Sequence, residues 1–262
     1  MRRRPRRVLV IASAMAAAAL IAGHAAAAQE ACRLTPIGTA QVAAVRDGRT
    51  LLLTDGRELR LAAIEVTDAS RAALQNLVAG RPLRLEKLGA ESDRYGRLVA
   101  FVYAGETEKS VQHALLEAGQ ARVSARVGDK ACAGALLAAE QAARAARAGL
   151  WADPNFAPIS AESSELLRRK RGQFALVEGK VLSVRAVGST IYVNFGRRWT
   201  RDFTVTIRRR LQKSFTAAGV EPSGLQGRRI RVRGFIEQRG GPIIEADGPE
   251  QIEFVDRRVT GG

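Results

Sequence analysis

The amino-acid sequence predicts a mainly β protein with helices, and three observations support this class. Short apolar runs are separated by the pairs Asp47-Gly48 and Asp55-Gly56, which are strong turn signals between strands. Apolar residues at helical spacing follow and end at Gly80, a typical helix terminator. After a proline-rich stretch that starts near Pro154, the same succession of strands and helix occurs again.

The first cycle of elements begins near Ile37 and predicts three strands, a helix, two strands and two further helices. The expected ranges, in this order, are 41–46, 50–54, 58–66, 69–79, 82–88, 98–103, 111–118 and 132–148. Three strands, a helix and two strands is the order of an OB-fold barrel.

A second cycle begins near Phe174. Its expected strands and helix are 175–187, 190–195, 203–207, 209–218 (the helix), 228–237 and 243–254. The topology repeats although the residues do not, so we expect two tandem OB-fold barrels, the first with two additional C-terminal helices. The predicted boundaries are 29–152 for the first domain, 153–171 for a linker, 172–256 for the second domain and 257–262 for a tail.

The N-terminus reads as a targeting segment. Five arginines precede an apolar run at 8–22, and Ala26-Ala27-Ala28 resembles a cleavage site, so residues 1–28 are predicted to be a secretory signal peptide. The alternative is an uncleaved anchor, but a span needs about 20 apolar residues, and Gly23 and His24 interrupt this one. The prediction is a periplasmic or secreted protein with no transmembrane segment after signal removal.

Two cysteines remain after signal removal, Cys32 and Cys132. Export places both in an oxidising compartment, so we expect a disulfide bond between them. The alternative is two independent buried thiols, and two cysteines are too few to indicate zinc.

Positive charge is concentrated in the second half of the chain. The formal charge of the whole sequence is +16, and removing the signal arginines leaves +11. Residues 29–160 hold 17 Lys and Arg against 15 Asp and Glu, whereas residues 171–262 hold 17 against 9. Such a basic half suits a polyanion such as nucleic acid, although an arginine-rich composition without functional meaning fits equally well.

Two short sequence runs contain the side chains that could bind and hydrolyse a phosphodiester. The first is Arg60, followed by Glu65 and Asp68, and the second is Asp93-Arg94-Tyr95-Gly96-Arg97. A guanidinium can hold two oxygens of a phosphodiester as negative charge develops on it. Nearby carboxylates are the groups that hold a metal ion or orient a water.

These runs resemble the site of the staphylococcal nuclease (thermonuclease) family, and the likeness extends over about residues 37–151. The resemblance implies that Arg60 and Arg97 hold the phosphate, that Asp68 acts as base or orients water, and that Arg94 and Tyr95 contact nucleic acid. It also implies a calcium ion, for which Glu65 and, in a reshaped turn, Asp47 would be the ligands.

The sequence departs from the family at the calcium ligands. The family's Asp-Gly-Asp-Thr turn reads Asp47-Gly48-Arg49-Thr50 here, and the two acids after Arg60 are exchanged in length. A guanidinium at about 5 Å repels a divalent ion by roughly 6–7 kcal/mol at an effective dielectric near 20. The expected cofactor is therefore none, or calcium only if Arg49 turns outward.

The sequence predicts a thermonuclease-like protein that binds nucleic acid or a similar polyanion, with weak or absent phosphodiester hydrolysis. One alternative is an active, calcium-dependent endonuclease of DNA or RNA, and another is a structural envelope protein with a protein or cell-wall partner. In the second barrel, one strand face and its loop are expected to contact the polyanion, as OB-folds do, although an ordinary solvated face with one tyrosine and a cationic loop is the alternative, because only one aromatic lies on the strand face. The candidates there are Tyr192, Arg197, Arg198, Trp199, Arg201 and Arg208.

Overall fold

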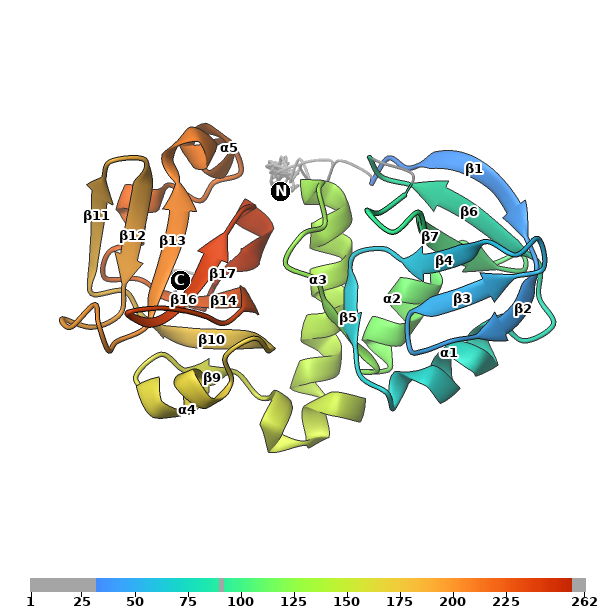
Figure 1. Ribbon diagram of the computed structural model, residues 1–262, viewed down its shortest axis with the longest axis horizontal. Coiled ribbons are helices and arrows are strands. Elements are labelled where there is room, and N and C mark those ends of the chain that lie inside the picture. The colour runs from blue at the N-terminus through green and yellow to red at the C-terminus, as the bar shows by residue number, and fades with distance from the viewer. Residues whose placement is uncertain (1–31, 90–91, 256–262) are drawn as a thin grey trace, which may run out of the picture. The chain divides into compact units, whose positions relative to one another are not determined.

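The first half of the chain forms a six-stranded sheet with the order β1-β6-β7-β4-β3-β2 (Figure 1). The computed structural model describes residues 32–89 and 92–255, so the predicted signal peptide (1–28) and tail (257–262) lie outside the described residues. Strands β4 and β7 are parallel, and the other neighbours are antiparallel. The strands are β1 (Thr35–Ala40), β2 (Val42–Val45), β3 (Thr50–Leu53), β4 (Glu58–Leu61), β6 (Leu83–Lys87) and β7 (Leu98–Ala104).

The first half is mainly β as predicted, but its sheet does not close into a barrel. Its two edge strands, β1 and β2, are consecutive in the chain and are separated only by Gln41. β1 pairs with β6 and β2 pairs with β3, so one stretch of chain supplies both edges, and within residues 32–89 and 92–255 these edges do not pair with each other.

The predicted strand 58–66 is wrong as a single element. Ala63 has a φ of 63°, a left-handed conformation that ends the extended run after β4. The chain then leaves the sheet as β5 (Ile64–Val66), which pairs with β8 (Ala121–Val123). This break places Glu65 on a separate two-stranded ribbon.

Three helices complete the first half. They are α1 (Ser70–Val78), α2 (Val111–Glu117) and α3 (Lys130–Ala145), and Asp129 caps α3 by accepting a hydrogen bond from the Cys132 amide at 2.8 Å. α1 buries Leu74 and Val78, which belong to the apolar core of the six-stranded sheet.

Cys132, in the first turn of α3, forms the predicted disulfide with Cys32. A loop of 100 residues is closed by this bond, which stabilises the fold by about 3–5 kcal/mol in the chain-entropy model.

The second half contains two sheets, β17-β14-β10-β9 and β11-β12-β13-β16-β15 (Figure 1). Each of the long runs predicted at 175–187, 228–237 and 243–254 is divided into two strands. The strands are β9 (Ile159–Ser160), β10 (Phe174–Lys180), β11 (Ser183–Val187), β12 (Thr190–Asn194), β13 (Thr204–Arg208), β14 (Arg229–Phe235), β15 (Glu237–Arg239), β16 (Gly241–Ala246) and β17 (Ile252–Phe254), and the helices are α4 (Ser164–Arg169) and α5 (Gln212–Ala217).

Buried groups connect the two halves. Each half has its own apolar core, and a third cluster joins Ala143 and Trp151 to Phe174 and Leu176. The side chain of Arg233 in β14 is fully buried and pairs with Glu140 of α3 at 2.9 Å. We call the connected charges around this pair the ion network, which comprises Glu140, Arg144, Arg231, Arg233 and Glu253.

No helix within residues 32–89 and 92–255 is both long and apolar enough to cross a membrane.

Candidate functional site

Arg60 and Arg97 lie on the same face of the first sheet. Arg60 stands in β4 between the buried residues Leu59 and Leu61, so its side chain projects away from the core. In the parallel pairing of β4 with β7, Leu59 is opposite Leu98 and Arg60 is opposite Val99. Arg97 immediately precedes the buried Leu98, so strand alternation puts it on the Arg60 side. The two phosphate-binding candidates are therefore brought together.

Arg60 is the least compensated cation of this face. Its side chain makes no hydrogen bond or ion pair with any other residue that the structure describes. Burial lowers the pKa of Arg60, and the positive charges of Arg49 and Arg97 lower it further, against the attraction of Glu65 and Asp47. A guanidinium that is crowded by two others favours an anion as its partner.

Arg97 is fixed in place by the turn that carries it. Asp93 accepts hydrogen bonds from Arg97 Nη2 at 2.7 Å and Nε at 2.9 Å, and this contact raises the pKa of Arg97. The other Asp93 oxygen accepts from the backbone amides of Tyr95 and Arg97, and Gly96 supplies the positive φ of 77° that the turn requires.

Tyr95 and Arg94 form an exposed rim on the same turn. Tyr95 is 67% exposed, and the guanidiniums of Arg94 and Arg97 lie 4.8 Å and 5.2 Å from its ring centroid. Arg94 also donates to the Tyr95 hydroxyl at 2.7 Å. The turn thus presents an aromatic face between two cations, a combination that suits stacked bases and phosphates.

Arg49 points inward and pairs with Glu65. Its Nη1 donates to Glu65 Oε2 at 2.5 Å and to the carbonyl of Ile64 at 3.2 Å. The two side chains are only 22% and 14% exposed, so solvent screens this pair incompletely. Ser124 of the loop after β8 donates to the other Glu65 oxygen at 3.3 Å. Each oxygen of Glu65 therefore accepts a hydrogen bond from the protein itself.

Close packing fixes the turn that presents Arg49. A Cβ added at Gly48 would lie 2.8 Å from both Ser70 Cβ and the Thr67 carbonyl oxygen. Asp47 accepts a hydrogen bond from the Arg49 amide at 2.8 Å, so its carboxylate is engaged within the turn. Only a residue without a side chain fits between Asp47 and Arg49.

The side chains at this place do not fit a calcium ion. Glu65 is paired with Arg49, and Asp47 is bonded to its own turn. Asp68 is exposed just before α1 and makes no side-chain hydrogen bond within the described residues. Across residues 32–89 and 92–255, no three His, Cys, Asp or Glu side chains are grouped closely enough to hold a metal. We call Arg49, Arg60, Glu65 and Arg97 the Arg60 site.

Ser124 was not predicted from the sequence to be part of this site. No motif surrounds it, and its contact with Glu65 depends on the pairing of β5 with β8, which are 55 residues or more apart in the chain. The Ala63 conformation that creates β5 also had no clear signal in the sequence.

In the second half, Tyr192 lies on the outer face of β12, opposite Arg185 of β11 and Thr206 of β13. Tyr192 is 37% exposed, and Arg185, which the sequence analysis did not select, is exposed beside it. A tyrosine with a neighbouring guanidinium is a suitable platform for one base and its phosphate.

The loop between β12 and β13 carries the remaining candidates, and we call it the cationic loop (197–201). Arg197, Arg198 and Arg201 are exposed and form no side-chain ion pair within the described chain. Trp199 is 70% exposed, and its ring lies against the backbone of Gly240. Arg208 differs, because it pairs with Glu245 at 3.2 Å and with Asp247.

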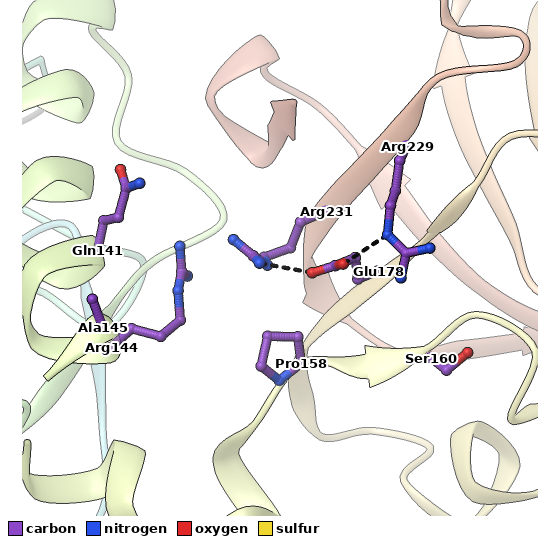
Figure 2. Close-up of a pocket in the computed structure, with 8 residues that line it drawn as sticks. All are labelled: Gln141, Arg144, Ala145, Pro158, Ser160, Glu178, Arg229 and Arg231. Carbon is purple, nitrogen blue, oxygen red and sulfur yellow. Dashed lines mark hydrogen bonds and ion pairs between the residues drawn. The ribbon is translucent and has the colours of Figure 1, made fainter. Parts of the chain in front are cut away.

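A pocket of about 510 Å³ is lined in part by Arg144 and Arg231 of the ion network (Figure 2). Its lining residues come from α3, from strands β9, β10 and β14, and from Pro158, which immediately precedes β9. They are Gln141, Arg144, Ala145, Pro158, Ser160, Glu178, Arg229 and Arg231. We call this cavity the Arg231 pocket.

Comparison with known families identifies a nuclease-like domain in the first half. Residues 56–153 match the model of the family described as staphylococcal nuclease homologue, as the resemblance of the two arginine runs predicted. The match includes Arg60, Glu65, Asp68 and Arg97, begins after the Arg49 turn and ends before the second half. No curated protein matches the chain.

Proposed function

We propose that this protein binds nucleic acid through its phosphates at the Arg60 site and hydrolyses phosphodiesters weakly or not at all. Arg60 and Arg97 contact the phosphate. Arg49 supplies a positive charge near the place where the related nucleases use a metal, and Glu65 holds Arg49 there. The observation that carries the proposal is the pairing of Arg49 with Glu65 beside a guanidinium, Arg60, that has no partner in the described chain.

Binding follows from the charge balance of the site. Arg49 and Arg97 are each hydrogen-bonded to a carboxylate, that of Glu65 and that of Asp93, and both guanidiniums repel Arg60. Within the described residues Arg60 has only the more distant attraction of Glu65 and Asp47, so its guanidinium is left without a bonded counter-ion in a partly buried setting, where charge-assisted hydrogen bonds to phosphate are strong.

Hydrolysis requires more than positive charge that binds phosphate. An attacking water must be activated and oriented, and the carboxylate nearest Arg60, that of Glu65, is engaged by Arg49 and Ser124. Asp68 is one methylene shorter than the glutamate that the resemblance places there, and a displacement near 1 Å can cost about 100-fold in rate.

The proposal is tested by measuring binding and cleavage on the same samples. Fluorescence anisotropy with a labelled oligonucleotide, single- and double-stranded, should give saturable binding that is unchanged by a chelator. Binding should weaken in Arg60→Gln and stay unchanged in Arg81→Gln, which removes an equal charge from an exposed loop residue. Arg49→Asp, which restores the carboxylate of the family turn, is expected to gain calcium-dependent cleavage.

Two outcomes would contradict the proposal. Chelator-sensitive cleavage by the unmodified protein would identify an active endonuclease. Binding that does not change with salt would indicate a protein or cell-wall partner instead, because phosphate contacts lower the logarithm of affinity by nearly one slope unit each.

The second half is proposed to be an OB-fold module that lengthens the contact with nucleic acid. Its pairings support this: β11-β12-β13 are antiparallel, β13 is parallel to β16, and β10 pairs with β14, in the same relation as the strands of the first half. Tyr192 and the cationic loop are the proposed contacts, and the proposed boundaries remain 29–152 and 172–256.

Export to the periplasm or the exterior is also proposed, supported by the Cys32–Cys132 disulfide, which an oxidising compartment preserves. N-terminal sequencing of the protein recovered from the cell envelope and the medium would test it, and a chain that begins at Gln29 is the expected result.

A further inference from the structure

The Arg231 pocket lies apart from the Arg60 site and is lined by different elements. Arg144 and Gln141 come from α3, Arg229 and Arg231 from β14, and Glu178 from β10. Its volume, about 510 Å³, lies within the range of small-molecule sites, roughly 300–1,000 Å³. Figure 2 shows the guanidinium ends of Arg144 and Arg231 turned toward each other from the two sides.

Carboxylates hold these guanidiniums in fixed positions. Arg144 donates to Glu140 and to Glu253, both at 3.0 Å, and Arg231 donates to Glu178 at 2.7 Å. Arg144 and Arg231 are only 13% and 16% exposed, so each is fixed by its partners rather than free in solvent. A ligand would find the donors already oriented, which lowers the entropic cost of binding.

The ion network has more positive than negative charge. Its guanidiniums are Arg144, Arg231 and Arg233, against the carboxylates of Glu140 and Glu253, and Glu178 is shared between Arg231 at 2.7 Å and Arg229 at 2.9 Å. Burial would raise the pKa of Glu253, but the charges of Arg233 and Arg144 outweigh burial and lower this pKa to about 2. The Glu253 carboxylate is thus ionised at neutral pH, and the guanidiniums outnumber the carboxylates by one, whether or not Glu178 and Arg229 are counted with the network.

Donor capacity is also left over. A guanidinium has five N–H donors, and Arg144 and Arg231 each use only two of them, in their hydrogen bonds to Glu140, Glu178 and Glu253. Gln141 adds an amide and Ser160 a hydroxyl to the lining. Donors that approach from α3 and from β14 match the tetrahedral oxygens of a phosphate better than a planar carboxylate.

We propose that the Arg231 pocket is a second binding site, for a small phosphate-bearing anion of about mononucleotide size. Arg144 and Arg231 contact the phosphate from opposite walls, and Gln141 and Ser160 contact the remainder of the ligand. The ligand connects α3 to β14 and therefore stabilises the contact between the two halves. This site does not depend on the Arg60 site or on its proposed function.

Isothermal titration calorimetry with inorganic phosphate, adenosine 5′-monophosphate and adenosine tests the proposal. The titrations use full-length protein carrying Arg60→Gln, so that only the pocket is measured. Phosphate and the monophosphate should bind saturably and adenosine should not. Gln141→Glu, which places a negative charge on the pocket wall with little change of shape, should weaken both about tenfold.

A matched control separates the pocket from general charge. Gln75→Glu makes the same exchange at an exposed position of α1 and should leave the affinity unchanged. Phosphate should raise the Tm of the parent and of Gln75→Glu more than that of Gln141→Glu. Equal affinity in Gln141→Glu and its parent, or no saturable phosphate binding at millimolar concentrations, would overturn the proposal.

Discussion

Strand β4 of the first half and strand β13 of the second each carry an outward-facing arginine at or near the end of the strand, and the two arginines have opposite surroundings. Arg60 ends the exposed row of β4, which runs parallel to β7, and faces Val99. Arg208 ends β13, which runs parallel to β16, and it pairs with Glu245 and Asp247 at the end of that strand. The same strand arrangement thus leaves one guanidinium available and neutralises the other.

This difference shows that total charge is a poor guide to where a polyanion binds. The second half holds most of the excess charge, yet its strand arginines Arg208, Arg231 and Arg233 are paired with carboxylates. Among the residues that the structure describes, the arginines of the cationic loop and Arg185 form no ion pair, and all of them are exposed. Among the described residues, the partly buried guanidinium without a hydrogen-bonded partner, that of Arg60, lies in the nearly neutral first half.

The largest expected effect concerns the most buried pair. Glu140→Gln would leave the fully buried Arg233 without its main counter-charge, so the free energy of unfolding should fall by about 3–5 kcal/mol. Urea denaturation followed by circular dichroism measures it. Glu165→Gln removes a carboxylate that pairs with two exposed arginines, Arg168 and Arg169, and should leave stability nearly unchanged. Similar losses for both variants would contradict the role assigned to burial.

Acid should weaken the same network. Glu253 has a pKa near 2 in the folded protein against 4.5 for the free side chain, so its stabilising effect is complete above about pH 4.5 and is lost as the pH falls toward 2. The free energy of unfolding should decrease by about 2 kcal/mol from this group between pH 6 and pH 3. Urea unfolding at both pH values should show a smaller decrease in the free energy of unfolding for Glu253→Gln than for the unmodified protein. An equal decrease would contradict the low pKa of Glu253.

The difference between the two strand arginines is tested directly by Arg60→Gln. Loss of a charge-assisted contact with phosphate should weaken oligonucleotide binding about 10- to 100-fold. The slope of log affinity against log salt should become shallower by about one unit. Anisotropy titrations over a series of salt concentrations give both quantities, and an unchanged slope would place the phosphate elsewhere.

The Tyr192→Leu variant tests the second half, where a smaller effect on binding is expected. Leucine keeps an apolar side chain on β12 but removes the ring on which a base would stack, so affinity for single-stranded oligonucleotide should fall about fivefold. Double-stranded oligonucleotide serves as the control, because its bases are already stacked. An equal loss for both would indicate that Tyr192 does not stack.

The smallest effect is expected for Arg208→Gln. Its charge is already balanced by Asp247 and Glu245, so oligonucleotide affinity measured by anisotropy should change by no more than about twofold. A loss of affinity as large as that of Arg60→Gln would show that Arg208 is as available to phosphate as Arg60.

Much of the fold was predictable from local signals. The Asp-Gly turns, the helix that ends at Gly80 and the alternation of β12 and β13 placed most elements within a few residues. The break at Ala63 was not predictable, because alanine rarely adopts a positive φ and only the tertiary pairing of β5 with β8 requires it. The bend between β10 and β11 was missed because Val181 and Leu182 continue the apolar run.

The site was predictable as a set of residue types but not as a set of contacts. The arginine runs indicated phosphate chemistry. Arg49, which replaces an aspartate of the Asp-Gly-Asp-Thr turn, indicated an altered metal site. The direction of Arg49 could not be read from the chain, because a long side chain reaches either solvent or Glu65. Ser124, Arg185 and Arg231 carry no motif, and each gains its position from strands that pair over long separations.

The disulfide has a consequence for proteolysis. Because Cys32 and Cys132 are joined, a protease that cuts the backbone once anywhere between them produces a nicked chain and not two fragments. The nicked protein would migrate as one species in a non-reducing gel and separate only after reduction. The helix that carries Cys132 also supplies Glu140 to the second half, so a single nick leaves the Arg60 strand covalently attached to the helix that anchors the rest of the molecule.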